Sequence, residues 1–167
     1  PQFHPAVQAW FGNSFPNGAT PAQLDAWPAI ASGNHALIAA PTGSGKTLAA
    51  FLAAIDSLMR EGAAGRLQDV TRVVYVSPLK ALAVDIAENL HRPLAEIAAI
   101  ATELGLDAPD IKVAVRTGDT TSTERARMVR KPPSFLITTP ESLYLLVTSA
   151  SGREALRTVD TVILDEI

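Results

Sequence analysis

The sequence predicts an α/β fold in which helices flank a mostly parallel sheet. Five apolar runs with strand character recur along the chain, at 36–41, 72–77, 111–116, 135–139 and 161–165. Their nearly continuous apolar composition is typical of strands that are buried on both faces, as in a parallel sheet. Helical patterns separate these runs, and such alternation implies right-handed crossovers between parallel strands. We therefore expect three layers, with helices on both faces of the sheet.

The helices are predicted from the spacing of apolar residues and from capping and stop signals. The predicted segments are 46–62, 79–92, 94–104, 121–129 and the residues that follow Pro140. Gly62 ends the first of them, and Pro93 ends or kinks the second. Thr121 and Glu124 have the spacing of a capping box, in which each side chain binds the other residue's backbone N–H.

The composition excludes several classes of protein. The chain has 167 residues, of which 47% are hydrophobic and 19% are charged, so it can bury a core and is not a disordered tail. The sequence has no cysteine, which excludes a disulfide framework. No apolar run reaches the roughly 18 residues that cross a bilayer. A net charge of −3 argues against a histone-like binder, and we expect a cytoplasmic protein.

The domain organisation predicted from the sequence is one domain with an N-terminal layer. Residues 1–33 form helices and loops, and residues 34–167 carry the predicted strands. The chain begins at Pro1 and stops at Asp165-Glu166-Ile167, directly after an apolar run. We therefore expect a piece of a longer polypeptide.

A glycine-rich loop lies between the first predicted strand and the first long helix. Glycines let backbone N–H groups turn inward around phosphate oxygens, and the helix N-terminus adds positive potential. Lys46 supplies a charge for the β- and γ-phosphates, and the Thr47 hydroxyl completes a Mg²⁺ shell. The predicted nucleotide-binding residues of the loop are Thr42, Gly43, Ser44, Gly45, Lys46 and Thr47.

Two adjacent acids end the last predicted strand. Asp165 is placed to hold Mg²⁺, directly or through water, and Glu166 to orient and deprotonate an attacking water molecule. An acidic strand end is common, but together with the phosphate loop it predicts nucleotide hydrolysis. We predict Glu166 and Lys46 as catalytic residues and Thr47 and Asp165 as metal ligands.

The order of these motifs resembles that of superfamily 2 DExH-box helicases. Thr20-Pro21-Ala22-Gln23 resembles the glutamine motif of that superfamily, in which Gln23 would bind the adenine edge. Pro41–Thr47 matches the helicase form of the phosphate loop, and Asp165-Glu166-Ile167 matches the start of the acidic box. The amino-acid sequences of residues 77–90, 116–122 and 138–146 are similar to those of the large helicase-related family of bacterial ATP-dependent DNA helicases.

The resemblance implies the first RecA-like domain of an ATP-dependent DNA helicase with roles such as DNA repair. It implies ATP and Mg²⁺ as cofactors and a second RecA-like domain that is missing from this chain. It also implies 3′-to-5′ movement on single-stranded DNA, with unwinding of duplex or RNA–DNA hybrid. Because the second domain normally brings arginine fingers, residues 1–167 alone are expected to be nearly inactive.

Three segments that follow predicted strands resemble the nucleic-acid-facing motifs of these motors. Single strands are held by hydroxyls, backbone N–H groups and isolated cations that contact phosphates. The residues 112–131 include six basic and two acidic side chains, a local positive excess. Of these, Arg125, Arg127 and Arg130 are interpreted as a solvated helix face. The predicted nucleic-acid-binding residues are Pro78, Lys80, Arg116, Thr117, Gly118, Thr139 and Ser142.

Two other functions are compatible with parts of the pattern. A different phosphate-loop enzyme, such as a small-molecule kinase, would need an acceptor pocket and an arginine-bearing lid. A nucleic-acid-binding module with a merely structural nucleotide site would not need the set Lys46, Thr47, Asp165 and Glu166. The serine, threonine and aspartate residues of the strand-end segments are also common in turns and helix caps.

Overall fold

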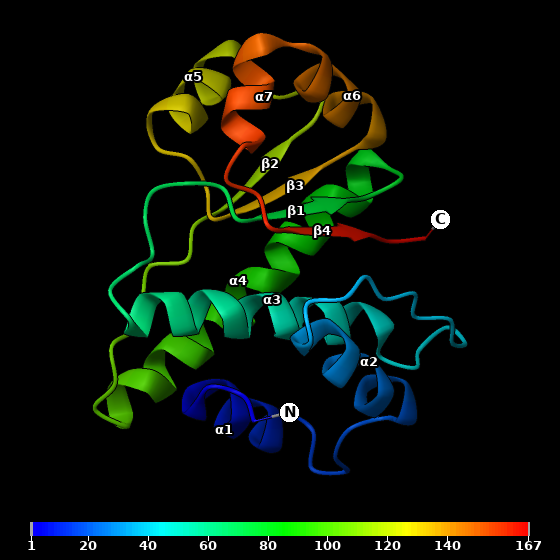
Figure 1. Cartoon of the computed structure of the whole chain (residues 1–167), viewed down its shortest axis with the longest axis vertical. Helices are drawn as coiled ribbons and strands as arrows, with labels where there is room; N and C mark the ends of the chain where they lie inside the picture. Colours follow the sequence, from blue (N-terminus) through cyan, green and yellow to red (C-terminus); the bar gives the residue numbers. More distant parts are fainter. Residues whose placement is uncertain (1, 167) are drawn as a thin grey trace. The chain divides into compact units, whose positions relative to one another are not determined.

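A computed structural model describes residues 2–166 (Figure 1). Ile167, the third residue of the predicted acidic box, lies outside the described residues. The chain divides into two compact units, each with its own internal contacts. Unit 1 contains residues 1–65 and 95–109, and unit 2 contains residues 66–94 and 110–167. The prediction of an N-terminal layer over 1–33 and a RecA-like domain over 34–167 stays a prediction.

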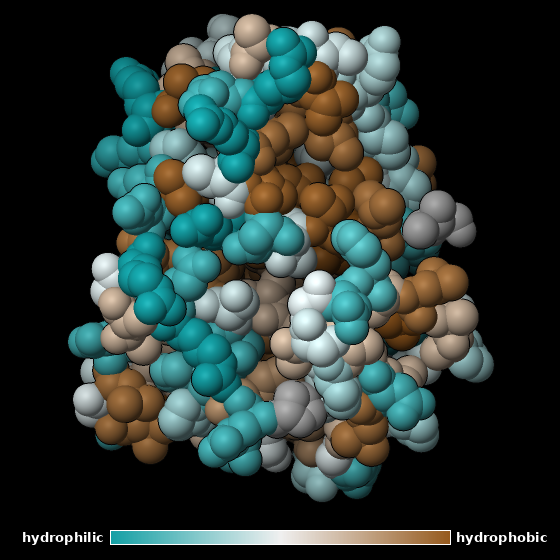
Figure 2. Space-filling model, viewed as in Figure 1, coloured by the Kyte–Doolittle hydropathy of each residue, from teal (hydrophilic) through white to brown (hydrophobic). Residues whose placement is uncertain are grey.

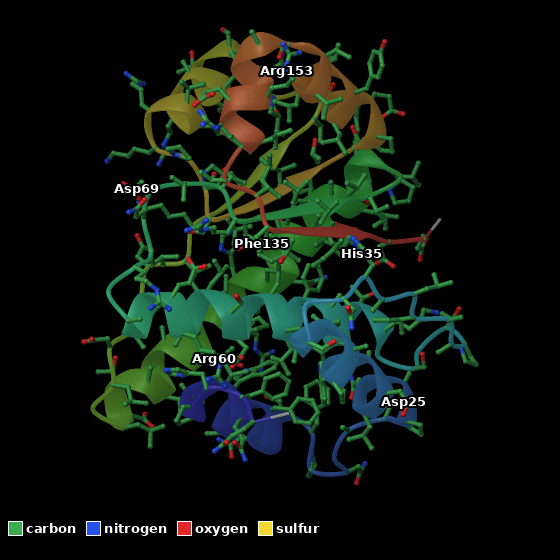
Figure 3. All side chains as sticks on the ribbon, viewed as in Figure 1. Asp25, His35, Arg60, Asp69, Phe135 and Arg153 are labelled. Atoms are coloured by element: carbon green, nitrogen blue, oxygen red, sulfur yellow. The ribbon has the colours of Figure 1, made fainter. Side chains whose placement is uncertain are left out.

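Unit 1 is helical in the part of the chain that the structure describes. It contains α1 (Pro5–Ser14), α2 (Pro21–Ala31), α3 (Lys46–Ala63) and the second part of α4 (Lys80–Glu103). Both α1 and α2 pack on α3 (Figure 1). The Trp27 indole of α2 donates a hydrogen bond to the Ala49 carbonyl of α3, at 3.1 Å. Arg60, labelled in Figure 3, pairs with Asp56 one turn away on α3 at 2.7 Å.

The predicted strand at 36–41 is wrong. Residues 34–41 have no regular secondary structure, and Leu37 is 87% exposed. A strand exists only where a neighbouring strand satisfies its backbone N–H and C=O groups, however suitable its side chains are. Among the described residues, no such partner is hydrogen-bonded to this segment. It therefore enters the phosphate loop as irregular backbone.

Unit 2 is built on a four-stranded sheet. The strands are β1 (Val73–Val76), β2 (Val113–Arg116), β3 (Phe135–Thr138) and β4 (Thr161–Leu164). Their order is β2-β3-β1-β4, and every pairing is parallel. The prediction of a parallel α/β sheet flanked by helices is thus confirmed, with four of the five predicted strands present.

Opposite faces of the central strands are both buried, as the apolar runs predicted. On one face, Val74, Val76 and Leu136 pack against a set of side chains from α5 (Ser122–Arg130), α6 (Pro140–Thr148), α7 (Ala150–Leu156) and the turn after α7. Figure 1 shows these three helices together on that side of the sheet. On the other face, Tyr75 and Phe135 are almost fully buried (Phe135 is labelled in Figure 3).

Two helix details differ from the sequence prediction. The helix α4 runs without interruption from Lys80 to Glu103, so Pro93 neither ends it nor separates a second helix. The sequence prediction does not include the short helix α7, which begins after Ser149, whose hydroxyl accepts a hydrogen bond from the Gly152 N–H at 3.1 Å. The capping box of Thr121 and Glu124 is confirmed, with both reciprocal hydrogen bonds present at the start of α5.

The described residues include no helix that is long and apolar enough to span a membrane.

Candidate nucleotide and nucleic-acid sites

The phosphate loop of unit 1 owes its shape to two glycines. Gly43 and Gly45 have φ angles of 80° and 81°, in the left-handed region that side chains other than glycine rarely adopt. Gly45 is constrained further by a close neighbour. A Cβ atom at this position would lie 2.4 Å from the side-chain nitrogen of Gln23, closer than non-bonded atoms approach. Any side chain at position 45 would therefore displace the loop or Gln23.

The N-terminus of α2 is hydrogen-bonded to the phosphate loop. The Thr20 hydroxyl donates a hydrogen bond to the Ser44 carbonyl at 2.7 Å, and Gln23 Nε2 donates to the Gly45 carbonyl at 3.3 Å. Gln23 Oε1 accepts a hydrogen bond from the Thr20 N–H at 2.9 Å, which closes a capping box. Gln23 is only 3% exposed, so its side chain is held in place by these contacts. Its role toward adenine stays a prediction.

The loop has the features that a nucleotide phosphate requires. Lys46 begins α3, and its ammonium group crosses the loop to donate to the carbonyls of Ala40 and Pro41. The Ser44 hydroxyl is buried and has no hydrogen-bond partner among the described residues. A buried, unpaired hydroxyl beside a helix N-terminus and a lysine fits an anionic oxygen. These residues therefore fit the triphosphate of a nucleotide.

The acidic pair of unit 2 follows β4. The Asp165 N–H donates to the Val76 carbonyl at 3.3 Å, which continues the ladder between β1 and β4. Asp165 Oδ2 accepts a hydrogen bond from the Tyr75 hydroxyl at 2.5 Å, and Oδ1 accepts one from the Glu166 N–H at 3.0 Å. Carboxylate oxygens are hard donors of the kind that Mg²⁺ prefers, so Asp165 fits the predicted metal role.

Tyr75 is a member of this site that the sequence interpretation missed. Burial raises the pKa of its phenol, and the hydrogen bond to Asp165 raises that pKa further. The hydroxyl therefore stays protonated and remains a donor over the whole physiological pH range. The signal that could have revealed it is its position. Tyr75 pairs with Ile163, two residues before Asp165, and side chains two residues apart share a face.

The ends of β1 and β2 bring together two of the predicted nucleic-acid-binding segments. Lys80 Nζ and Asp119 Oδ1 form an ion pair of 2.9 Å between exposed side chains. Gly118, next to Asp119, lies so near that a Cβ atom there would be 3.4 Å from Lys80 Nζ. Pro78 is exposed in the turn that precedes α4. The structure therefore places Pro78, Lys80 and Gly118 at the carboxyl edge of the sheet, where they are accessible.

Three of the predicted nucleic-acid-binding residues have buried side chains. Thr117, Thr139 and Ser142 are 6%, 1% and 7% exposed. The Thr139 and Ser142 hydroxyls are hydrogen-bonded to each other at 3.3 Å, and the Thr117 hydroxyl accepts from the Asp119 N–H at 3.3 Å. These hydroxyls maintain the turns after β3 and β2. Their direct contact with nucleic acid stays a prediction.

Arg125 was interpreted from the sequence as part of a solvated face, but the structure gives it a different role. Its guanidinium donates to the carbonyls of Thr117 and Gly118, at 3.3 and 3.4 Å, and so holds the loop that follows β2. Its Nε is buried with no partner among the described residues. Burial lowers the pKa of Arg116, and the positive charge of nearby Arg125 lowers it further. Two close, partly desolvated guanidiniums favour a bound anion.

The phosphate loop, the acidic pair and the cationic strand ends are the features of a nucleic-acid-dependent NTPase. The family model for DEAD/DEAH box helicases matches residues 20–167, and the chain belongs to this family. The Lhr helicase/probable uracil glycosylase of Mycolicibacterium smegmatis is 54% identical over 169 residues, which cover 99% of this chain and 11% of that protein. The ATP-dependent helicase Lhr-Core protein 2 of Thermococcus barophilus is 52% identical over 161 residues, which cover 96% of this chain and 18% of that protein. These relatives confirm the resemblance to the large helicase-related family.

Solved structures agree with this assignment. The structure of the Mycobacterium smegmatis helicase Lhr bound to ssDNA and AMP-PNP superposes with a TM-score of 0.88 at 54% identity. The match covers 98% of this chain and 20% of that one. The DEAD-box helicase Mss116 superposes with a TM-score of 0.78 at 23% identity, which supports the RecA-like fold alone. The chain thus spans about a tenth to a fifth of the length of the Lhr relatives, and its match covers 31% of the Mss116 chain.

Proposed function

We propose that this chain is the ATP-binding lobe of an ATP-dependent DNA helicase or translocase. The observation that carries the proposal is the phosphate loop held by Thr20 and Gln23, in a chain whose family consists of helicases. Lys46 would contact the β- and γ-phosphates, and Gly43 and Gly45 allow the loop's N–H groups to surround them. Thr42 and Ser44 would complete this cradle.

The chemistry that we propose for the site is hydrolysis by water. Thr47 would supply a hydroxyl and Asp165 a carboxylate to Mg²⁺, which neutralises charge on the phosphates. Glu166 would take a proton from the attacking water, and Gln23 would bind the adenine edge. The second RecA-like domain of the full-length protein would complete the site, so the present lobe alone turns over slowly. We place the protein in the cytoplasm.

The nucleic-acid track that we propose follows the carboxyl edge of the sheet in unit 2. Lys80 and Arg116 would contact phosphates, and the backbone at Gly118 and at the start of α6 would donate N–H groups. Thr117, Thr139 and Ser142 would shape these turns, and Pro78 would border them. The proposed ligand is single-stranded DNA, with movement from 3′ to 5′ and unwinding of duplex or RNA–DNA hybrid.

Strand separation by the full-length protein tests the function. Duplexes that carry a 3′ tail, a 5′ tail or no tail, each with a fluorescent strand, are incubated with ATP or with AMP-PNP. We expect separation only with ATP and only for the 3′-tailed duplex, for DNA and for RNA–DNA hybrid alike. Separation from the 5′ tail would contradict the direction. A DNA affinity that is the same with and without nucleotide, together with no ATP turnover, would instead favour a binding module.

Lys80→Ala in the full-length protein should weaken binding to single-stranded DNA. Loss of one phosphate contact reduces the slope of log K against log salt by about 0.7. Lys112→Ala is the matched control. Lys112 forms a similar surface ion pair, with Asp69 at 2.5 Å, but precedes β2 and so lies at the opposite end of that strand from Arg116. Equal salt slopes for the two variants, measured by fluorescence anisotropy, would contradict the role of Lys80.

A further inference from the structure

The Asp165 carboxylate accepts hydrogen bonds from two different parts of the chain. One donor is the backbone N–H of Glu166, its neighbour in the chain. The other is the hydroxyl of Tyr75, which lies ninety residues away in sequence and belongs to the central strand β1. Tyr75 is 1% exposed, so packing holds its ring and the hydroxyl cannot follow the carboxylate if that moves. The phenol therefore defines where Asp165 Oδ2 lies.

The strand register places the two residues together. Tyr75 pairs with Ile163 and Val76 pairs with Leu164, and the Asp165 N–H then donates to the Val76 carbonyl. Asp165 is two residues beyond Ile163, so its side chain leaves the sheet on the face that carries Tyr75. Two adjacent residues of β1 thus hold Asp165, one through its backbone and the other through its carboxylate.

The two hydrogen bonds fix the orientation of the carboxylate group. A carboxylate has about four lone-pair sites, and each oxygen of Asp165 accepts one of these bonds. Because both oxygens are held, the direction in which the group faces a cation is fixed as well. An O–H donor at 2.5 Å from a carboxylate is a short, charge-assisted hydrogen bond. Partners of this kind orient metal ligands, and their removal typically costs about 10- to 100-fold in metal affinity or activity.

We propose that Tyr75 is a positioning residue for the Mg²⁺ of the ATP site, acting through the Asp165 carboxylate. This inference rests on the proposed role of Asp165 as a ligand of that ion. In this proposal Tyr75 is not itself a ligand of the nucleotide or the metal and acts only through Asp165. Its hydrogen bond holds the Asp165 side chain in one rotamer before the metal binds, so that metal binding does not have to order this side chain.

The test measures binding of Mn²⁺, as a probe for Mg²⁺, to the full-length protein with AMP-PNP. Free Mn²⁺ is counted by electron paramagnetic resonance, a readout that does not depend on turnover. Tyr75→Phe keeps the buried ring and removes the hydroxyl, and we expect a Kd for Mn²⁺ about tenfold higher. Tyr144→Phe makes the same chemical change at an exposed tyrosine of α6 and should leave the Kd unchanged.

Two further measurements separate the possible failures. Asp165→Ala should raise the Kd for Mn²⁺ more than Tyr75→Phe does. If Asp165→Ala has no effect, the proposed metal role of Asp165 is wrong. If Asp165→Ala weakens Mn²⁺ binding and Tyr75→Phe does not, the positioning role of Tyr75 is overturned. A merely structural role of the hydroxyl would lower the melting temperature of Tyr75→Phe and leave its Mn²⁺ affinity equal to that of Tyr144→Phe.

Discussion

Lys46→Ala in the full-length protein is expected to reduce ATP turnover by about 100-fold or more. The Lys46 ammonium reaches across the phosphate loop to the carbonyls of Ala40 and Pro41, the position from which it would contact bound phosphates. Removal of one such fixed donor from a developing negative charge costs about 10²–10³ in rate. Alanine has a high helix propensity, so the start of α3 should persist.

Steady-state release of phosphate, with saturating single-stranded DNA, measures this effect. Lys112→Ala is again a suitable control, because it removes a lysine from the surface of unit 2 without touching the loop. A circular dichroism spectrum shows whether the variant keeps its helices. Turnover by Lys46→Ala within a few-fold of the unmodified protein would exclude the phosphate loop as the site of hydrolysis.

Glu166→Gln is expected to preserve ATP binding and to reduce hydrolysis by about 10²–10⁴-fold. The amide has the shape of the carboxylate but cannot accept the proton of an attacking water, which is the contribution of a general base. Glu166 is exposed directly after Asp165, and its backbone N–H would continue to hold Asp165 Oδ1 in the variant. The metal ligand should therefore be unaffected.

Binding of a fluorescent ATP analogue and single-turnover release of phosphate distinguish the two steps. Glu154→Gln makes the same change at an exposed glutamate of α7 that pairs with Arg157, and it should alter neither step. Loss of nucleotide binding in Glu166→Gln, with the fold intact, would assign this glutamate to the binding of ATP rather than to proton transfer. Unchanged hydrolysis would remove it from the mechanism.

The sequence prediction of strands is correct where the predicted segment is also hydrogen-bonded to a neighbouring strand. The runs around Val74, Leu136 and Ile163 are apolar, and each is hydrogen-bonded to a neighbouring strand in the structure. The run at 36–41 has the same local character but no partner among the described residues, so it is irregular. Strand propensity is a local property, whereas pairing is not, and the sequence pattern contains only the first.

The chemical groups of the candidate site were predictable, but their supports were not. Lys46 and Asp165 follow from motifs whose spacing is local. Tyr75 supports Asp165 across two strands, and Arg125 supports the loop after β2 through main-chain carbonyls. Neither contact has a sequence motif, because a phenol or a guanidinium at those positions looks like an ordinary core or surface residue. Such supports become visible only when the strand register is known.

The position of β4 at the edge of the described sheet has a practical consequence for laboratory work. Its residues Val162 and Leu164 are each 55% exposed, and Figure 2 shows apolar surface in the part of the view that contains β4 and α6. Thr161–Leu164 contains neither a charge nor a proline, the usual protections of a strand edge. An isolated preparation of residues 1–167 is therefore expected to self-associate through this edge as its concentration rises.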